Sequence, residues 1–106
     1  MLHSTKNQNK FPQALKTARI ARGLSQEAFS LVSSRTYVSS LERGLKAPTL
    51  SKVDELAEVL NVHPLTLLAL SYMKDGDNKE ITHLLDGVSR QLQEILGVIG
   101  SNQQPD

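Results

Sequence analysis

Side chains suited to binding a polar partner are concentrated between Ser33 and Lys46. Near its start stands an arginine, Arg35. The stretch also contains several hydroxyl groups and two further cations, and its single acidic residue is Glu42. A guanidinium can pair with O6 and N7 of guanine through two hydrogen bonds, or it can clamp a phosphate. The chemistry indicated here is the recognition of base edges or of phosphates.

Residues that could support catalysis or hold a metal are not arranged to do so. His3, His63 and His83 lack a ligand spacing such as HExxH, and the chain has no cysteine. The serines have no neighbouring histidine base, and no glycine-rich phosphate loop is present. We therefore predict that the protein has no enzymatic activity, no metal and no cofactor.

The sequence around the polar stretch predicts two short helices joined by a tight turn. Gly23 supplies a positive φ that ends one helix, and Ser25 can cap the next, in which Phe29 faces inward. Ser33 or Ser34 can cap the helix that follows. Its apolar residues face the core, its polar residues lie on other faces, and a glycine closes it: Val38 and Leu41; Arg35, Thr36, Ser39 and Ser40; Gly44. This is the layout of a DNA-reading helix-turn-helix.

Three further helices are expected around this pair. The first begins near Pro12 and runs to Arg22, and a later helix is capped by Thr49 and stopped at Asn61. Another starts at Pro64. The inward residues expected for these helices are Leu15, Ala18 and Ile20 or Ala21 in the first; Leu50, Val53, Leu56, Ala57 and Leu60 in the next; and Leu65, Leu68 and, as a further candidate, Tyr72 in the last.

A different pattern follows residue 77. Asp77 and Glu80 form a capping box for a long helix, whose apolar residues repeat at heptad spacing: Ile81, Leu85, Val88, Leu92, Ile95 and Ile99. Such a face needs a partner surface, and the simplest is a second copy of the chain; a second protein partner is the alternative. The domains expected are a flexible N-terminal arm (1–10), a DNA-binding domain (11–74), a dimerisation helix (78–100) and a disordered tail (101–106).

Charge is divided unevenly along the 106 residues. Residues 1–52 carry nine Lys and Arg against two acidic residues, 9 − 2 = +7, and residues 53–106 carry three against nine, 3 − 9 = −6. A basic first half fits contact with a polyanion. The N-terminus has no apolar leader and the apolar stretch 62–73 is too short to span a bilayer, so we expect no membrane contact and a cytoplasmic, nucleoid-associated protein.

Three stretches, LKTARIARGLSQ, SRTYVSSLERG and APTLSKVDELAEVLNVHPLTLL, resemble the lambda-repressor and Cro-like (XRE-type) family of helix-turn-helix regulators in the right order. The resemblance covers roughly residues 11 to 70. It implies an all-α fold, a five-helix DNA-binding domain, here followed by the additional C-terminal amphipathic helix. One departure is a turn between Phe29 and Arg35 that is two residues shorter than the usual spacing and lacks the usual glycine, so a tighter turn is expected.

The resemblance also implies functional positions. Base edges would be read by Arg35, Thr36, Ser39 and Ser40, and phosphates bound by Gln26, Ser34, Tyr37, Arg43 and Lys46. A buried structural ion pair would join Arg19 to Glu42. Alternatives stay open for four of these positions: a phosphate clamp for Arg35, simple solvent exposure for Thr36 and Ser40, and core packing for Tyr37.

These patterns predict a sequence-specific regulator of transcription that binds double-stranded DNA. The leading hypothesis is a homodimeric repressor on an inverted-repeat operator, with one recognition helix in each half-site. One alternative is an antitoxin or a restriction-modification controller that uses the same domain. A protein-interaction module with only nonspecific DNA affinity is the hypothesis from another class.

Overall fold

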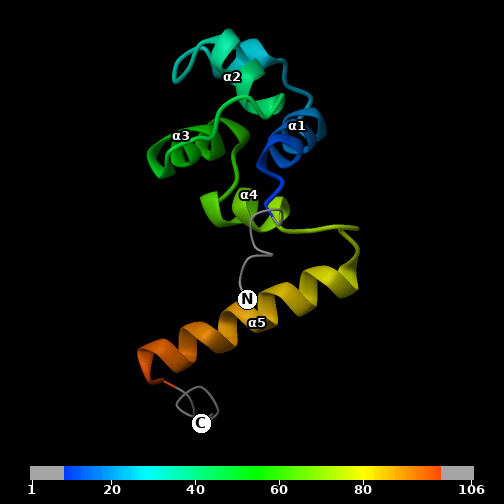
Figure 1. The fold of residues 1–106 in the computed structure, drawn as a ribbon, viewed down its shortest axis with the longest axis vertical. Helices are drawn as coiled ribbons and strands as arrows, with labels where there is room; N and C mark the ends of the chain where they lie inside the picture. Colours follow the sequence, from blue (N-terminus) through cyan, green and yellow to red (C-terminus); the bar gives the residue numbers. More distant parts are fainter. Residues whose placement is uncertain (1–8, 99–106) are drawn as a thin grey trace. The chain divides into compact units, whose positions relative to one another are not determined.

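The computed structural model describes residues 9–98, and every regular element in that range is helical (Figure 1). The elements are α1 (Phe11–Ala21), the single-turn 3-10 helix η2 (Gln26–Phe29), α2 (Arg35–Glu42), α3 (Leu50–Leu60), α4 (Pro64–Ser71) and α5 (Asn78–Leu96). The expected all-α fold is confirmed. Contacts divide the chain into two units after Met73. We call residues 9–73 the head domain and describe it separately from α5.

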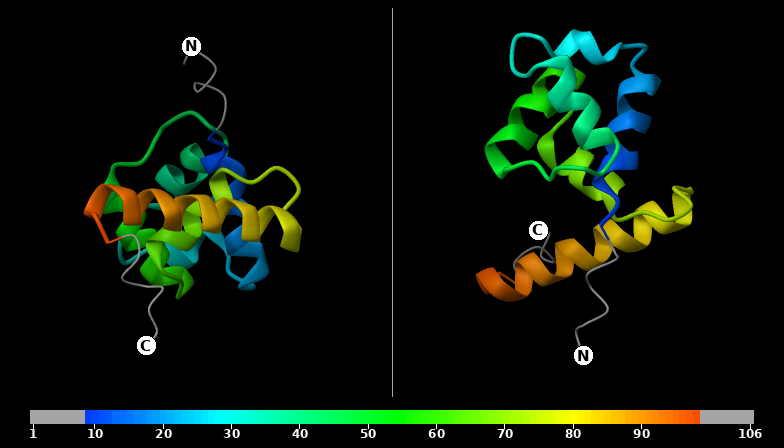
Figure 2. Two further views of the ribbon diagram at one scale, coloured as in Figure 1. Left: turned by 90° about the horizontal axis from the view of Figure 1, so that it is seen from below. Right: turned by 45° about the horizontal axis from the view of Figure 1, so that its top comes forward.

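The head domain packs four helices and η2 around one core. α1 contacts α2 and α4, α3 contacts α4 and η2, and η2 contacts α2. The two views of Figure 2 show how these elements are arranged. The buried apolar side chains are aliphatic or phenyl groups from every element of the head domain: Phe11, Ala14, Leu15, Phe29, Val38, Leu41, Val53, Leu56, Ala57, Leu60 and Leu67. The start of α1 is fixed to the end of α4, because the amide of Lys10 donates to the carbonyl of Ser71 at 2.7 Å.

Helix boundaries in the head domain follow the capping residues of the sequence. The Ser34 hydroxyl accepts from the amide of Tyr37 at 3.0 Å, and the Thr49 hydroxyl accepts from the amide of Lys52 at 3.1 Å. These are N-cap bonds, which satisfy amides that the first helical turn leaves free. Asn61 ends α3 with a φ of 60°. The caps predicted at Ser34 and Thr49 and the left-handed stop at Asn61 are confirmed. Ser25, which was also predicted to cap a helix, precedes η2 but its side chain makes no capping hydrogen bond.

Several residues expected to face inward are exposed. Ile20 is 58% exposed, Leu50 76% and Leu65 66%, and Ala21 and Tyr72 are also exposed. Leu50 occupies the first position of α3, before the helix reaches the core. In α4 most residues are apolar, so spacing could not identify the buried side, and Leu67 is buried in place of Leu65. These inward assignments were wrong.

The α5 helix is capped by Asp77, whose carboxylate accepts a hydrogen bond from the amide of Glu80 at 2.8 Å. The Glu80 carboxylate accepts from the amides of Lys74, Asp75 and Gly76, at 2.7, 2.8 and 2.7 Å. In a capping box, the Glu80 carboxylate would accept from the amide of Asp77. Glu80 is therefore an acceptor as expected, but its donors are the amides of the three residues before Asp77. These bonds lower the pKa of Glu80 from its ordinary value, the Gly76 amide contributing most.

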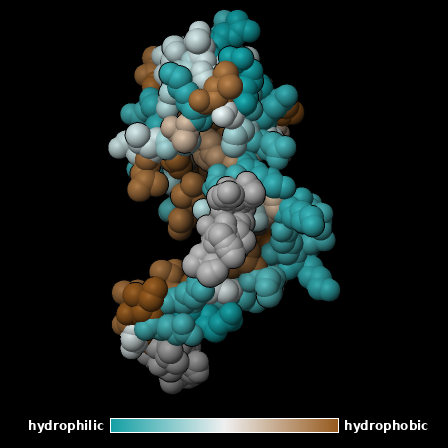
Figure 3. All heavy atoms as spheres, viewed as in Figure 1, coloured by the Kyte–Doolittle hydropathy of each residue, from teal (hydrophilic) through white to brown (hydrophobic). Residues whose placement is uncertain are grey.

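The heptad residues of α5 form an exposed apolar side. Leu85, Val88, Leu92 and Ile95 are 50%, 43%, 52% and 79% exposed, and Ile81 is half-buried. Figure 3 shows hydrophobic side chains gathered along part of this helix. The sixth predicted seam residue, Ile99, lies outside the described residues, as do most of the predicted arm and all of the predicted tail. Within residues 9–98, no helix combines the length and apolar character needed to cross a membrane.

Candidate nucleic-acid interface

One buried carboxylate joins α1 to α2. Arg19 Nε lies 2.7 Å from Glu42 Oε2 and Arg19 Nη2 lies 3.0 Å from Glu42 Oε1. The two side chains are only 13% and 4% exposed. Arg19 Nη1 also donates to the Leu24 carbonyl at 3.0 Å, and the hydrogen bond with Glu42 raises the pKa of Arg19. The structure therefore contains the expected ion pair, which fixes the end of α2 against α1.

The same carboxylate holds the start of η2. Gln26 Nε2 donates to Glu42 Oε1 at 3.1 Å, so Glu42 accepts hydrogen bonds from two elements. An amide nitrogen carries two hydrogens. One N–H of Gln26 thus belongs to the scaffold, and the other is free to reach an anion beside the first turn of η2.

The tight turn between η2 and α2 closes without a glycine. The Phe29 carbonyl accepts from the amides of Val32 and Ser33 at 2.9 and 2.8 Å. No residue from 30 to 34 has a positive φ, so this backbone imposes no need for the glycine that the usual turn has. Leu31 is 97% exposed at the turn.

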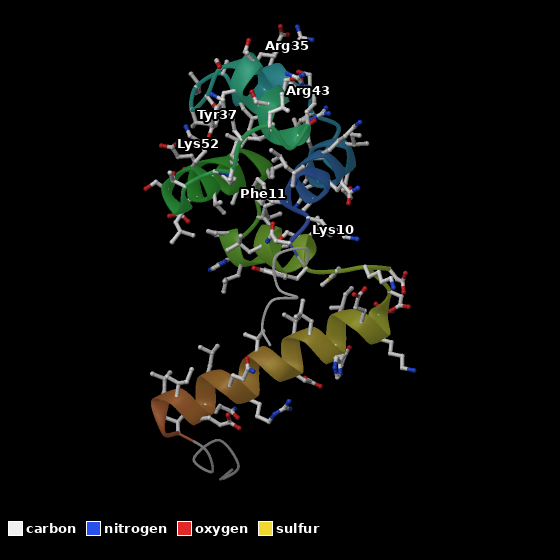
Figure 4. The ribbon with its side chains drawn as sticks, in the orientation of Figure 1. Lys10, Phe11, Arg35, Tyr37, Arg43 and Lys52 are labelled. Atoms are coloured by element: carbon white, nitrogen blue, oxygen red, sulfur yellow. The ribbon has the colours of Figure 1, made fainter. Side chains whose placement is uncertain are left out.

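The start of α2 displays the candidate base-reading residues. Arg35 and Thr36 are exposed in its first turn, and Ser39, one turn later, is half-buried. Figure 4 shows Arg35 projecting from the end of the head domain. The Arg35 side chain is 67% exposed, and its Nη1 lies 3.7 Å from Oε2 of Glu27. Sequence reasoning placed Glu27 at the positive end of the first motif helix and did not pair it with Arg35.

Ser40 requires a correction. It is 6% exposed, and its hydroxyl donates to the Thr36 carbonyl of the same helix at 2.9 Å. Its side of α2 is continuous with the buried side made by Val38 and Leu41. A hydroxyl that is buried and already bonded cannot reach a base edge, so the expectation that Ser40 reads DNA is wrong. The other three base-reading assignments remain proposals.

The ring of Tyr37, on α2, lies close to two cations, one in the loop after α2 and one on α3. Tyr37 is half-buried against the core, and the ammonium groups of Lys46 and Lys52 lie 5.9 and 5.8 Å from its ring centre. Tyr37 therefore packs against the core, and positively charged side chains lie beside its ring. Arg43 and Lys46 are exposed, as phosphate contacts require.

Sequence reasoning missed Lys52. Its Nζ donates to the Val32 carbonyl at 2.6 Å and lies 2.7 Å from Oε1 of Glu55. The pair of Lys52 and Glu55 three residues apart on one helix was visible in the sequence, but such pairs are common on solvated faces. The bond to Val32 depends on the tertiary fold. In the described part of the chain, no group of three or more His, Cys, Asp or Glu residues could hold a metal ion.

A tight turn followed by a helix whose first turn projects Arg35 defines a helix-turn-helix domain. Comparison with known proteins agrees with this class. The family model described as Helix-turn-helix matches residues 15–67. The chain belongs to the XRE-type helix-turn-helix family of DNA-binding transcription regulators. Members of this family are regulators and not enzymes.

Two relatives are similar over most of their own length. Control protein C.BamHI of Bacillus amyloliquefaciens is 30% identical over 73 residues, which cover 66% of this chain and 90% of the relative. The crystal structure of the restriction-modification controller protein C.AhdI from Aeromonas hydrophila is 36% identical, with a TM-score of 0.53. That match covers 96% of the C.AhdI chain but only 57% of this one, so this chain carries a substantial part with no counterpart there.

Proposed function

We propose that this protein is a sequence-specific DNA-binding regulator of the restriction-modification controller type. One observation carries this proposal: an exposed arginine, Arg35, stands at the start of a recognition helix that a buried ion pair holds in place. The similarity to two proteins named as control or controller proteins supports the controller role. A phage-type or metabolic regulator shares the fold, but no observation on this chain favours either.

In the proposed complex, α2 lies in the major groove with its first turn toward the bases. Arg35 pairs with guanine O6 and N7, which supplies about 1 to 3 kcal/mol of discrimination against another base. Thr36 and Ser39 contact neighbouring base edges. Around them, phosphates are bound by the free N–H of Gln26, the hydroxyl hydrogens of Ser34 and Tyr37, and the cations of Arg43 and Lys46.

The protein works as a homodimer on an inverted repeat. The apolar side of α5 from Ile81 to Ile95 pairs with a second copy, which places two head domains on one duplex. Half-sites on the same side of DNA lie about 10 base pairs apart. A dimer bound over a promoter excludes polymerase, so repression is the expected outcome. We expect this to take place in the cytoplasm, at the nucleoid.

The test is selection of bound duplexes from a random DNA pool at physiological salt. Wild type should enrich an inverted repeat, and Arg35→Ala should lose preference at one position in each half-site. The matched control is Arg90→Ala, which removes an exposed arginine from α5. It should enrich the same repeat as wild type.

Two outcomes would contradict different parts of the proposal. An unselective pool with wild-type protein would mean that the domain binds DNA only through charge, with the steep salt dependence of phosphate contacts. A selected site that Arg35→Ala leaves unchanged would keep a specific regulator but remove Arg35 from base reading. Placement of the selected site near restriction or methyltransferase genes tests the controller role.

A further inference from the structure

Glu27 is out of place on a surface that approaches phosphates. Residues 9–52 contain two acidic residues, Glu27 and Glu42. Glu42 is buried and bonded to Arg19 and Gln26, whereas the Glu27 side chain is 71% exposed. An exposed carboxylate repels phosphates and weakens binding to any DNA sequence. Its presence among the eight cations of the same stretch, residues 9–52, calls for a compensating role: Lys10, Lys16, Arg19, Arg22, Arg35, Arg43, Lys46 and Lys52.

The neighbour of Glu27 is the candidate base-reading arginine. Arg35 Nη1 lies 3.7 Å from Glu27 Oε2. The two side chains line a shallow notch of about 300 Å³ together with Arg19, Ser25 and Gln26. The carboxylate comes from η2 and the guanidinium from α2. The two elements on either side of the tight turn thus meet through this pair, at the end of the head domain that Figure 4 marks with Arg35.

Arg35 also lacks electrostatic support from its own helix. It occupies the first position of α2, where the helix dipole disfavours a cation, and the first turn of α2 contains no acidic residue. Glu27 supplies the missing negative charge. The separation of 3.7 Å is longer than a hydrogen bond, so the N–H groups of Arg35 are available for another acceptor while the carboxylate lies beside them.

We propose that Glu27 is a specificity-determining positioning residue that holds the Arg35 guanidinium in the orientation that pairs with guanine. A long side chain loses rotamer freedom when it binds, and orienting it beforehand lowers that loss. Glu27 therefore weakens binding to phosphates in general and strengthens discrimination at one base pair. This inference rests on the base-reading role assigned to Arg35 in the proposed function.

The test compares two duplexes: the selected operator and the same operator with the guanine opposite Arg35 replaced by adenine. The measured quantity is the ratio of the two dissociation constants. Glu27→Gln should reduce this ratio about threefold or more, because the oriented state loses its ionic partner. Glu58→Gln, which removes the same charge from an exposed position on α3, should leave the ratio unchanged. In an Arg35→Ala background, Glu27→Gln should also leave it unchanged.

The outcomes separate this inference from the proposed function. If Glu27→Gln tightens binding to both duplexes equally, as Glu58→Gln does, Glu27 acts only through its charge and the inference is wrong. If Glu27→Gln lowers the ratio equally with and without Arg35, Glu27 reads DNA itself and does not position Arg35. If Arg35→Ala keeps the wild-type preference at every base position in the selection experiment, the base-reading role of Arg35 is wrong, and this inference is wrong with it.

Discussion

The ammonium group of Lys52, on α3, donates a hydrogen bond of 2.6 Å to the main-chain carbonyl of Val32, in the turn that precedes α2. Lys52 thereby connects the helix after the motif to the turn within it. Its side chain is 22% exposed and passes beside the ring of Tyr37 on α2. A turn that is shorter than usual is fixed from outside the helix-turn-helix by a side chain that sequence reasoning had not assigned.

Replacing Lys52 with methionine should destabilise the head domain. The variant keeps an unbranched, flexible side chain but leaves the Val32 carbonyl without its charged donor, which costs about 1 to 3 kcal/mol. Urea denaturation measures this loss. Lys46→Met is the matched control, since Lys46 lies at a similar distance from Tyr37. It should weaken DNA binding with little change in stability. Equal stabilities for the two variants would contradict a bracing role for Lys52.

Removing one partner of the ion pair of Arg19 and Glu42 should destabilise the head domain more than Lys52→Met does. Glu42→Gln leaves a largely buried guanidinium without its counter-charge, and breaking such a pair costs about 3 to 5 kcal/mol. Because the hydrogen bond with Glu42 raises the pKa of Arg19, the contribution of the pair is complete at neutral pH and is lost only in strong base. Chemical denaturation at pH 7 should show the full loss, and a change under about 1 kcal/mol would mean that the pair is effectively solvated.

The two hydroxyl residues of α2 that were assigned to the same role should behave differently. Ser40 is buried and bonded to the Thr36 carbonyl, whereas the side chain of Thr36 is exposed. Thr36→Ala should alter preference at one base position in a duplex-binding panel. Ser40→Ala should leave every base preference unchanged. A changed preference in Ser40→Ala would show that α2 rearranges when it binds DNA.

Sequence patterns predicted the features that depend on local chemistry. Ser34 and Thr49 cap their helices because a hydroxyl before a helix satisfies its first free amides, wherever the helix packs. Patterns failed where packing decides. Ser40 and Leu65 occupy positions whose burial depends on how closely a neighbouring helix approaches. The contact of Glu27 with Arg35 and the bond from Lys52 to Val32 were missed for the same reason, since each links two segments across the tertiary fold.

The N-terminal cap of α5 should respond to pH through Glu80. Its carboxylate accepts hydrogen bonds from three amides, which lower the pKa of Glu80 from the ordinary value of 4.5. A lowered pKa means that the interaction is complete above 4.5 and is lost as the pH falls through the still lower value of the folded protein. The amide proton shifts of Lys74, Asp75 and Gly76 should therefore titrate together, with a midpoint below 4.5. Glu80→Gln should abolish this common titration. Separate midpoints for the three amides would disprove a shared acceptor.

The apolar side of α5 should control oligomeric state. Leu92, 52% exposed, belongs to the heptad series, and Leu92→Lys would place an unpaired ammonium in a dimer interface, where desolvation is costly. Sedimentation at micromolar concentration should show a wild-type dimer and a Leu92→Lys monomer that binds an inverted repeat far more weakly. His83 is two residues after Ile81, about 200° around the helix, so His83→Lys adds the same charge on the opposite side and should remain dimeric. A monomeric wild type would refute pairing through α5. The four exposed heptad residues, Leu85, Val88, Leu92 and Ile95, would then have no second copy against them.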